Sequence, residues 1–274
     1  MGGCRRDRQG ETAEPDRERK DAVGRNMEST DRKTAIEFRN VTKTYKLYRS
    51  DKLRLLSVFW KGVKHTEKRA VDNVSFSVRQ GESLAFIGRN GAGKSTILKM
   101  ITGVAFPTEG DIVVEGRVSA LLELTAGFDE EMSGRDNIYL KGQLMGLKDK
   151  EIERREEEIV AFAELGEYID QPVRTYSSGM RAKLGFAVNV CIEPEVFIVD
   201  EALSVGDKVF QAKCLEKVNA LIEKDNVTLI FVTHSIDVAK KFCKRGIVLK
   251  EGRMVCDTDI EQAAAYYEQH MADN

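Results

Sequence analysis

The apolar residues of this chain fall into short unbroken runs and helical stripes that alternate along the sequence. Runs at Ser83–Ile87, Val196–Val199 and Thr228–Val232 have the length and composition of buried strands. Segments Ser95–Ile101 and Lys148–Leu165 follow a helical period instead. The inward-facing stripe of the longer segment comprises Ile152, Ile159, Val160, Phe162 and Ala163. Strands that alternate with helices predict an α/β fold.

The two ends of the chain have different patterns. The expected C-terminal elements are a helix at Asp237–Cys243, a strand pair at Gly246–Lys250 and Arg253–Asp257, and a last helix at Asp259–Met271. Residues 1–33 alternate acids and bases without a large apolar cluster, which predicts a disordered charged tail. Met27 is an alternative start to Met1, and the intact mass of the native protein would distinguish them.

Residues Gly88–Ser95, GRNGAGKS, match the phosphate-loop pattern GxxxxGKS. The pattern lies between a predicted strand and a predicted helix, so bound phosphates would meet a helix N-terminus. Backbone N–H groups would cradle the phosphates, Lys94 would reach the β and γ phosphates as a catalytic residue, and Ser95 would bind Mg²⁺. A chance glycine-rich turn is a poor alternative, because strand, loop and helix agree. The predicted ATP contacts are Gly88, Arg89, Asn90, Gly91, Ala92, Gly93, Lys94, Ser95 and Thr96.

Two further apolar strands end in side chains suited to phosphoryl transfer. Val196–Val199 leads into Asp200 and Glu201, at the strand end where open α/β sheets place their ligands. Asp200 would hold Mg²⁺, and Glu201 would orient or deprotonate the attacking water. His234 follows the next apolar strand, which we expect to lie beside the acidic one, and could sense the γ phosphate as a second catalytic side chain. The alternative for the acidic pair alone is a solvated strand end.

Residues Tyr176–Met180, YSSGM, resemble the signature of the ATP-binding cassette (ABC) ATPases, which normally reads LSGGQ. The residues at the signature's serine and two glycine positions are Ser177, Ser178 and Gly179. The resemblance also places Asp207 in a D-loop, and Tyr45 where an aromatic side chain stacks on adenine. Packing of Tyr45 in the core is the alternative.

The resemblance implies the fold of a P-loop NTPase ABC cassette. This fold has a mixed sheet core, an antiparallel β lobe and a helical signature lobe, here at about 129–180. The implied domains are the tail at 1–33, a nucleotide-binding domain at 34–250, and a short C-terminal strand and helix at 251–274.

In this family two cassettes bind head to tail. The resemblance therefore implies a homodimer, in which Ser177 and Gly179 touch the γ phosphate held by the partner's Lys94. The N-terminus of a helix that begins around Met180 would add positive potential. A monomer would hydrolyse ATP poorly.

The stretch Leu121–Leu147 looks most like the polysaccharide-exporter branch of these ATPases, which includes teichoic acid and O-antigen exporters. Where the family has a glutamine, Glu123 falls nearest and could bind a metal-bound water. The resemblance implies ATP and Mg²⁺ as cofactors and two copies of a separate multi-span permease as partners. It also implies a peripheral position on the cytoplasmic face of the cell membrane, with membrane contact through the permease. The glycan and the permease are not named by the sequence.

An insertion separates the predicted strands Ala35–Arg39 and Ala70–Val78, and it is longer than most cassettes carry. Its apolar residues at helical spacing are Leu53, Leu56, Phe59, Trp60 and Val63. Its basic residues are Lys46, Arg49, Lys52, Arg54, Lys61, Lys64 and Lys68. A basic amphipathic segment can meet a membrane surface or a partner helix, and we expect this one to face the permease. The alternative is a helix that packs its stripe on its own domain.

Composition narrows the classes of function. No apolar run approaches the roughly 18 to 20 residues that a bilayer requires, so we expect no membrane span. The formal net charge of -2 gives no reason to expect nucleic acid as a partner. The five cysteines show no CxxC or metal-ligand spacing, which suits a reducing cytoplasm.

Two other functions remain open from the sequence. One is a soluble ABC ATPase of DNA repair or translation, although the chain lacks a long coiled-coil insertion and a second cassette. The other is a nucleotide-binding scaffold with little turnover, suggested by Met180 and Glu123 at positions where the family has glutamine. The presence of the phosphate-loop lysine, the acidic pair and the histidine argues against the scaffold.

Overall fold

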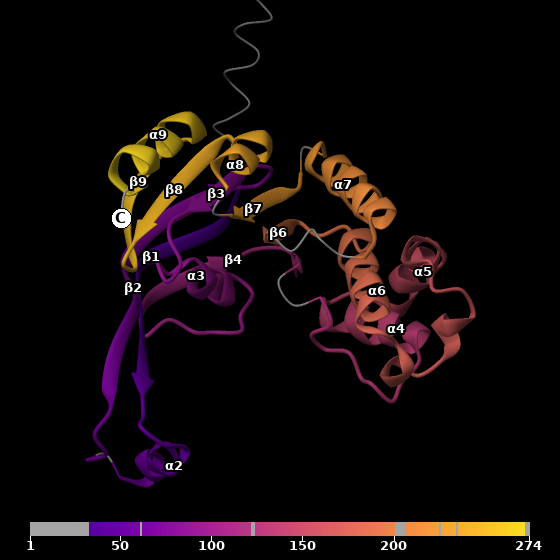
Figure 1. The fold of residues 1–274 in the computed structure, drawn as a ribbon, viewed down its shortest axis with the longest axis horizontal. Helices are drawn as coiled ribbons and strands as arrows, with labels where there is room; N and C mark the ends of the chain where they lie inside the picture. The colour runs from indigo at the N-terminus through magenta and orange to yellow at the C-terminus, as the bar shows by residue number, and fades with distance from the viewer. Residues whose placement is uncertain are drawn as a thin grey trace, which may run out of the picture. The chain divides into compact units, whose positions relative to one another are not determined.

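Two β-sheets form the framework of the chain (Figure 1). The computed structural model describes residues 33–60, 62–121, 124–200, 206–224, 226–233 and 235–271, with only the backbone of Asp200. Within these ranges the smaller sheet is antiparallel, in the order β2-β1-β4. Its strands are β1 (Thr34–Leu47), β2 (Thr66–Arg79) and β4 (Glu109–Val114).

The larger sheet has the order β5-β6-β7-β3-β8-β9 and is parallel except for its last pair. Its strands are β5 (Val118–Ala120), β6 (Val196–Asp200), β7 (Thr228–Val232), β3 (Ser83–Ile87), β8 (Arg245–Lys250) and β9 (Arg253–Asp259). A mixed sheet beside an antiparallel sheet confirms the predicted fold class.

The helices join and cover these sheets (Figure 1). Those near the core are α3 (Lys94–Ile101), α7 (Lys208–Ile222), α8 (Ile236–Phe242) and α9 (Ile260–Met271). A helical lobe contains α4 (Gly134–Leu144), α5 (Asp149–Ala163), η2 (Gly166–Asp170), η3 (Val173–Thr175) and α6 (Ser178–Cys191). Among the helices in the described ranges, none has the length and apolar character that a membrane crossing requires.

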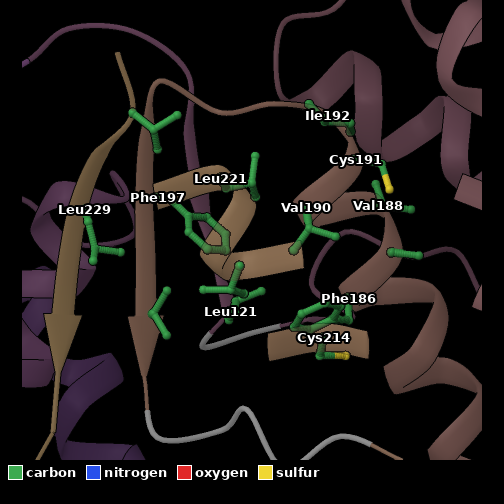
Figure 2. Packing of buried hydrophobic residues seen from close by; sticks show 14 of the residues in the cluster. Leu121, Phe186, Val188, Val190, Cys191, Ile192, Phe197, Cys214, Leu221 and Leu229 are labelled. Atoms are coloured by element: carbon green, nitrogen blue, oxygen red, sulfur yellow. The ribbon is translucent and has the colours of Figure 1, made fainter. Parts of the chain in front are cut away.

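The central strand β3 separates two hydrophobic clusters, because successive side chains of a strand point to opposite faces. Leu84 and Phe86 pack into the cluster that contains α3 and the antiparallel sheet, whereas Ala85 and Ile87 pack into the cluster on the helical side. Figure 2 shows the second cluster, in which Phe197 of β6 points toward side chains from α7. The sheet therefore packs against the nucleotide-side elements on one face and against the helical lobe on the other.

Three phenylalanines connect the helical lobe to α7. The ring centroids of Phe162 and Phe186 lie 5.9 Å apart, and Phe210 meets both rings edge-on. In the predicted inward stripe of α5, Ile152, Ile159, Phe162 and Ala163 are buried, and Val160 is half-buried. Each of these rings comes from a different helix, so a change in α7 reaches α5 and α6 through direct packing.

The C-terminal strand and helix belong to the same compact unit, Thr34–Asn274, as the rest of the described chain. β9 pairs with β8, and α9 packs against β8 so closely that a Cβ on Gly246 would lie 2.7 Å from Cβ of Ala263. Of the expected disordered tail at 1–33, residues 1–32 lie outside the described residues.

The insertion contains longer strands than predicted and an exposed helix. β1 and β2 extend well past the predicted strands and pair as two arms from Thr44↔Arg69 to Leu47↔Thr66. Between the arms, α2 (Asp51–Phe59) has no buried residue. The alternative of a helix that packs its stripe on its own domain is therefore wrong. We call residues 44–69 the hairpin, and Figure 1 shows α2 at its far end.

Candidate functional site

The phosphate loop connects β3 to α3, and two of its glycines are required by contacts within the chain. Gly93 has φ of +109° and forms the N-cap of α3. A Cβ at this position would lie 2.7 Å from the carbonyl oxygen of Ala70, and a Cβ on Gly88 would lie 2.6 Å from that of Leu249. Only glycine allows this backbone to turn and pack so closely. The loop thus ends where the unpaired N–H groups of α3 can meet an anion.

The Lys94 side chain lies across this loop. It is 9% exposed, and its Nζ donates hydrogen bonds to the carbonyl oxygens of Gly88 and, at 3.2 Å, of Arg89. A buried ammonium group needs such partners, because desolvation without them is costly. The lysine therefore holds its charge inside the loop, next to the start of α3.

A pocket of about 500 Å³ opens in front of the loop. Its lining comprises Tyr45, Leu47, Lys68, Ala70, Arg89, Asn90, Gly91, Gly93, Lys94, Ser95, Thr96 and Val232. The structure thus brings most of the predicted ATP contacts to one cavity. Gly88 and Ala92 do not line it; Ala92 is buried behind the loop.

Tyr45 is a half-buried residue in the wall of this pocket and not a core residue. The Nζ atom of Lys43 lies 5.2 Å from the centroid of its ring. Sequence reasoning missed Lys68 and Ala70 as pocket residues. Lys68 pairs directly with Tyr45 in the β1–β2 ladder, so the strand register could have identified it.

The acidic strand lies where the sequence placed it. β6 pairs in parallel with β7, which confirms that the strand before His234 lies beside the acidic one. Asp200 pairs with Val232, and Val232 pairs with Phe86 of β3. At about 4.8 Å per strand, the backbone of Asp200 is about 10 Å from the strand that enters the phosphate loop. Glu201, His234 and Glu123 lie outside the described residues, as does the Asp200 side chain.

The signature residues lie at the start of α6. Ser177 is the N-cap, and its Oγ accepts a hydrogen bond from the backbone N of Met180 at 3.2 Å. The helix begins at Ser178 and not around Met180, because the serine cap allows it to start earlier. Ser177, Ser178 and Gly179 are exposed, and none lines the phosphate-loop pocket. The nearest atom to a Cβ on Gly179 would be the Ser177 Oγ, at 3.9 Å.

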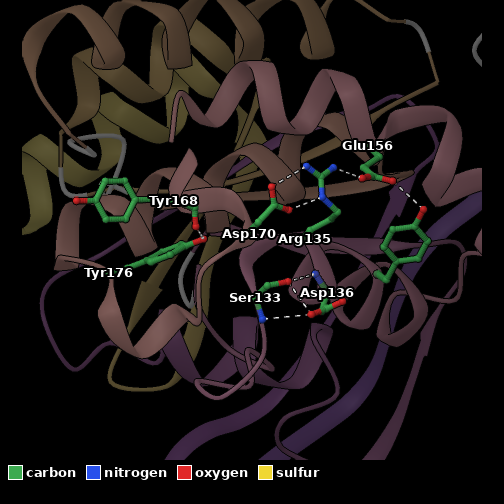
Figure 3. Close-up of polar contacts among 8 residues, drawn as sticks. Ser133, Arg135, Asp136, Glu156, Tyr168, Asp170 and Tyr176 are labelled. Carbon is green, nitrogen blue, oxygen red and sulfur yellow. Dashed lines mark hydrogen bonds and ion pairs between the residues drawn. The ribbon is translucent and has the colours of Figure 1, made fainter. Parts of the chain in front are cut away.

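Polar contacts in the helical lobe fix the segment before the signature (Figure 3). The Tyr176 hydroxyl donates to the carbonyl oxygen of Tyr168 at 2.6 Å. Arg135 donates to Asp170 at 2.7 Å and also to Glu156, and this lowers the pKa of Asp170. The signature loop is therefore exposed but firmly supported from behind.

Asp207, predicted as a D-loop contact, caps α7. Its Oδ1 accepts hydrogen bonds from the backbone N–H groups of Val209 and Phe210, both at 3.0 Å. The bond from Phe210, followed by the charge of Lys183, lowers the pKa of Asp207. This side chain does not line the phosphate-loop pocket.

A smaller hollow of about 250 Å³ lies where the core strands meet the helical lobe. Ser95 and Val104 line it from the α3 side, and Met145 lines it from the helical lobe. Lys141 also lines it, is 7% exposed, and donates to the carbonyl oxygens of Leu124 at 3.1 Å and Ala126 at 3.0 Å. Lys141 thus links α4 to the backbone of Leu124 and Ala126, which precede this helix in the sequence.

Comparisons with known proteins agree with this geometry. The family description "ABC transporter" matches residues 71–204. The O-antigen export system ATP-binding protein RfbB of Klebsiella pneumoniae is 44% identical over 86% of this chain and 98% of its own. The teichoic acids export ATP-binding protein TagH of Staphylococcus haemolyticus is 41% identical over 87% of this chain and 90% of its own.

Solved structures share the fold at lower identity. An ATP-binding subunit of an ABC transporter has a TM-score of 0.67 at 23% identity, covering 87% of this chain and 95% of its own. A dimeric, post-hydrolysis ATP-binding cassette bound to ADP and Pi has a TM-score of 0.63 at 23% identity, covering 82% and 98%. These two likenesses extend the agreement to the arrangement of sheets and helices.

Proposed function

The chain belongs to the ABC transporter family as an exporter ATPase, and we propose that it drives export of a lipid-linked polysaccharide or teichoic acid across the cytoplasmic membrane. RfbB of Klebsiella pneumoniae and TagH of Staphylococcus haemolyticus match it over 98% and 90% of their own lengths. This likeness supports the class of cargo. The identity of the glycan is a separate question.

One observation carries the ATPase part of the proposal: a single pocket contains Tyr45, the phosphate loop and the start of α3. An aromatic ring suits the base, and loop N–H groups with a lysine suit the phosphates. We infer that Tyr45 stacks on adenine and that residues 89–96 hold the triphosphate.

The residues present also fit Mg²⁺. Ser95 is exposed in the first turn of α3 and lines the phosphate-loop pocket. The backbone of Asp200 ends the strand two positions away from β3 in the sheet, and its carboxylate would be the second oxygen donor. Bound Mg²⁺ would neutralise phosphate charge. Glu201 would position or deprotonate the attacking water, His234 would contact the γ phosphate, and Glu123 would bind a metal-bound water.

We further propose that the working enzyme is a homodimer. Ser177 and Gly179 are exposed, and Gly179 has no packing within the chain that requires glycine. In a head-to-tail dimer these residues, with the N-terminus of α6, would close over the phosphates held by the partner's Lys94. Asp207 would lie beside this interface. As the N-cap of α7, it would fix the direction in which the chain enters that helix.

The partners in the membrane are proposed to be two copies of a multi-span permease, which would place the chain peripherally at the cytoplasmic face. The hollow between α3 and the helical lobe supports this part of the proposal, because Val104 and Met145 give it an apolar lining. It also borders Ser95, so a permease segment seated there would feel changes at the nucleotide.

The test is co-purification from native membranes in the presence of ATP. Glu201→Gln should retain ATP and hold a multi-span membrane protein together with lipid-linked glycan, identified by mass spectrometry. Lys94→Ala is the control that should not form the ATP-dependent complex. Recovery of ribosomes or DNA with a soluble dimer of Glu201→Gln would contradict export and leave only the ATPase.

A further inference from the structure

The hairpin concentrates exposed apolar side chains at its tip. The exposed fractions are 68% for Leu55, 75% for Val58, 91% for Phe59 and 68% for Trp60. No described part of the chain shelters these side chains, because α2 has no buried residue. Large apolar surface left in water at one place indicates an interaction site.

The apolar side chains cover a broad face and not a narrow seam. At about 100° per residue, Leu55, Leu56, Val58 and Phe59 spread over about 160° of the helix circumference. Trp60 follows directly, at the C-cap of α2. A partner helix needs only a narrow stripe, whereas the end of a helix that enters a lipid headgroup layer is surrounded.

Basic residues flank this apolar tip in the sequence. Between residues 46 and 68 the sequence has seven basic and two acidic residues. The basic residues are Lys46, Arg49, Lys52, Arg54, Lys61, Lys64 and Lys68, and the acidic residues are Asp51 and Glu67. Arg49 and Lys64 line a hollow of about 660 Å³ beneath α2, together with Trp60. Apolar and basic groups in one place complement the phosphates and upper acyl chains of an anionic bilayer.

We propose that the tip of the hairpin docks directly on a bilayer surface with anionic headgroups. Leu55, Val58, Phe59 and Trp60 enter the headgroup region, where aromatic side chains are favoured. The exposed side chains of Lys52, Arg54 and Lys64 contact lipid phosphates. This contact goes beyond the export function, because it requires a lipid surface but no permease and no ATP hydrolysis.

The hairpin also connects this contact to the nucleotide pocket. Leu47 lines both the hollow beneath α2 and the phosphate-loop pocket, and Tyr45 lies two residues before it on the same strand. The paired arms of β1 and β2 therefore fix the distance between the bilayer and the ATP-binding pocket. Docking would orient the ATPase on the membrane.

The chain provides its own reporter, because Trp60 is its only tryptophan. The full chain should show a blue shift of tryptophan emission on addition of phosphatidylglycerol-containing vesicles, reversed by high salt. Pure phosphatidylcholine vesicles should give a much smaller shift. Brominated lipids should quench the emission, because the indole would lie at the headgroup level.

Vesicle co-sedimentation tests the residues. Phe59→Ser/Trp60→Ser and Lys52→Glu/Arg54→Glu should each weaken binding by about tenfold or more. Tyr168→Ser and Lys150→Glu/Arg154→Glu remove an exposed aromatic ring and an exposed basic pair from the helical lobe, and should bind like wild type. Circular dichroism and ATP binding would check that each variant is folded.

Two outcomes would overturn the proposal. One is that wild type does not bind anionic vesicles, or that the hairpin and control variants bind equally. The other is that the hairpin variants lose only permease binding in neutral-lipid nanodiscs, which would assign this surface to a protein partner. Neither outcome would alter ATP hydrolysis, so a failure here is distinguishable from a failure of the export function.

Discussion

The phosphate loop and the signature loop both place glycine near the start of a helix, but only the phosphate loop requires its glycine for packing within the chain. Each places glycine near the start of a helix, α3 or α6, where unpaired N–H groups can meet an anion. Gly93 is required by its own chain, through its φ of +109° and the close carbonyl of Ala70. Gly179 has no such requirement. The contrast indicates that the second loop is shaped for something outside the chain.

We expect the largest effect from removing the charge of Lys94 in the phosphate loop. Lys94→Met should lower kcat for ATP hydrolysis by about 10²- to 10³-fold, the usual cost of losing a preorganised charged donor. Steady-state phosphate release would measure it. Lys150→Met, on the exposed face of α5, is the control and should keep full activity. Comparable rates of ATP hydrolysis in the two variants would show that Lys94 has no catalytic role.

Alanine at Gly179 should separate activity from stability. The unfolding free energy should stay the same or rise by up to about 1 kcal/mol, because alanine favours the helix and meets no atom closer than 3.9 Å. ATP hydrolysis should nevertheless fall by about tenfold or more, because a methyl group would enter the space of the partner's phosphates. Denaturant unfolding and ATPase assays on one preparation would measure both quantities. Full ATPase activity of Gly179→Ala would show that no ligand packs against Gly179.

Alanine at Gly93 should do the reverse. The left-handed backbone and the 2.7 Å approach to Ala70 should lower the unfolding free energy by about 1–3 kcal/mol. ATP binding should be lost together with stability, since the same backbone forms the loop. If Gly93→Ala were as stable as Gly179→Ala, the contrast between the two loops would disappear.

A smaller effect is expected at Tyr45, which we propose stacks on adenine. Tyr45→Ala should raise the Kd for ATP by about tenfold, because stacking on a base contributes about 1–3 kcal/mol. Tyr45→Phe is the matched control and should bind nearly as wild type. Titration with a fluorescent ATP analogue would measure both. Equal weakening by the two variants would point to the hydroxyl group and away from stacking.

The smallest effect concerns the support behind the signature. Arg135 lowers the pKa of Asp170 below its ordinary value, so this pair stabilises the folded state above the ordinary carboxylate pKa and ceases to do so as pH falls through the lowered one. Asp170→Asn should therefore unfold slightly earlier in urea than wild type at pH 7, with the difference vanishing in acid. Both groups are substantially exposed, so the difference should be small. A difference that grows in acid would contradict this sign.

The sequence predicted the core strands better than the hairpin, for a physical reason. β3 and β7 have the predicted bounds, because both are unbroken apolar runs that the fold buries completely or nearly so. The arms of β1 and β2 contain no buried residue, so no burial pattern marks where they end. Their pairing depends on backbone hydrogen bonds, which the side-chain pattern does not reveal.

The site follows the same division. The GxxxxGKS motif predicted the phosphate loop, because local chemistry determines it. The apolar run before His234 predicted the bounds of its strand. Lys68 was missed as a pocket residue because its place depends on the register with Tyr45. The roles of Glu201, His234 and Glu123 remain predictions. The helical spacing of apolar residues also predicted the stripe of α2, but it does not indicate which partner the stripe contacts.

A mixing experiment tests most directly whether the two loops complete one site across two chains. Lys94→Ala and Gly179→Glu should each be nearly inactive alone. When dimers of the two are dissociated, mixed and reassembled, half should be heterodimers with one intact site, which restores about a quarter of the wild-type rate if sites act independently. Activity no greater than the sum of the two separate variants would show that both loops serve the same chain, and would contradict the composite site.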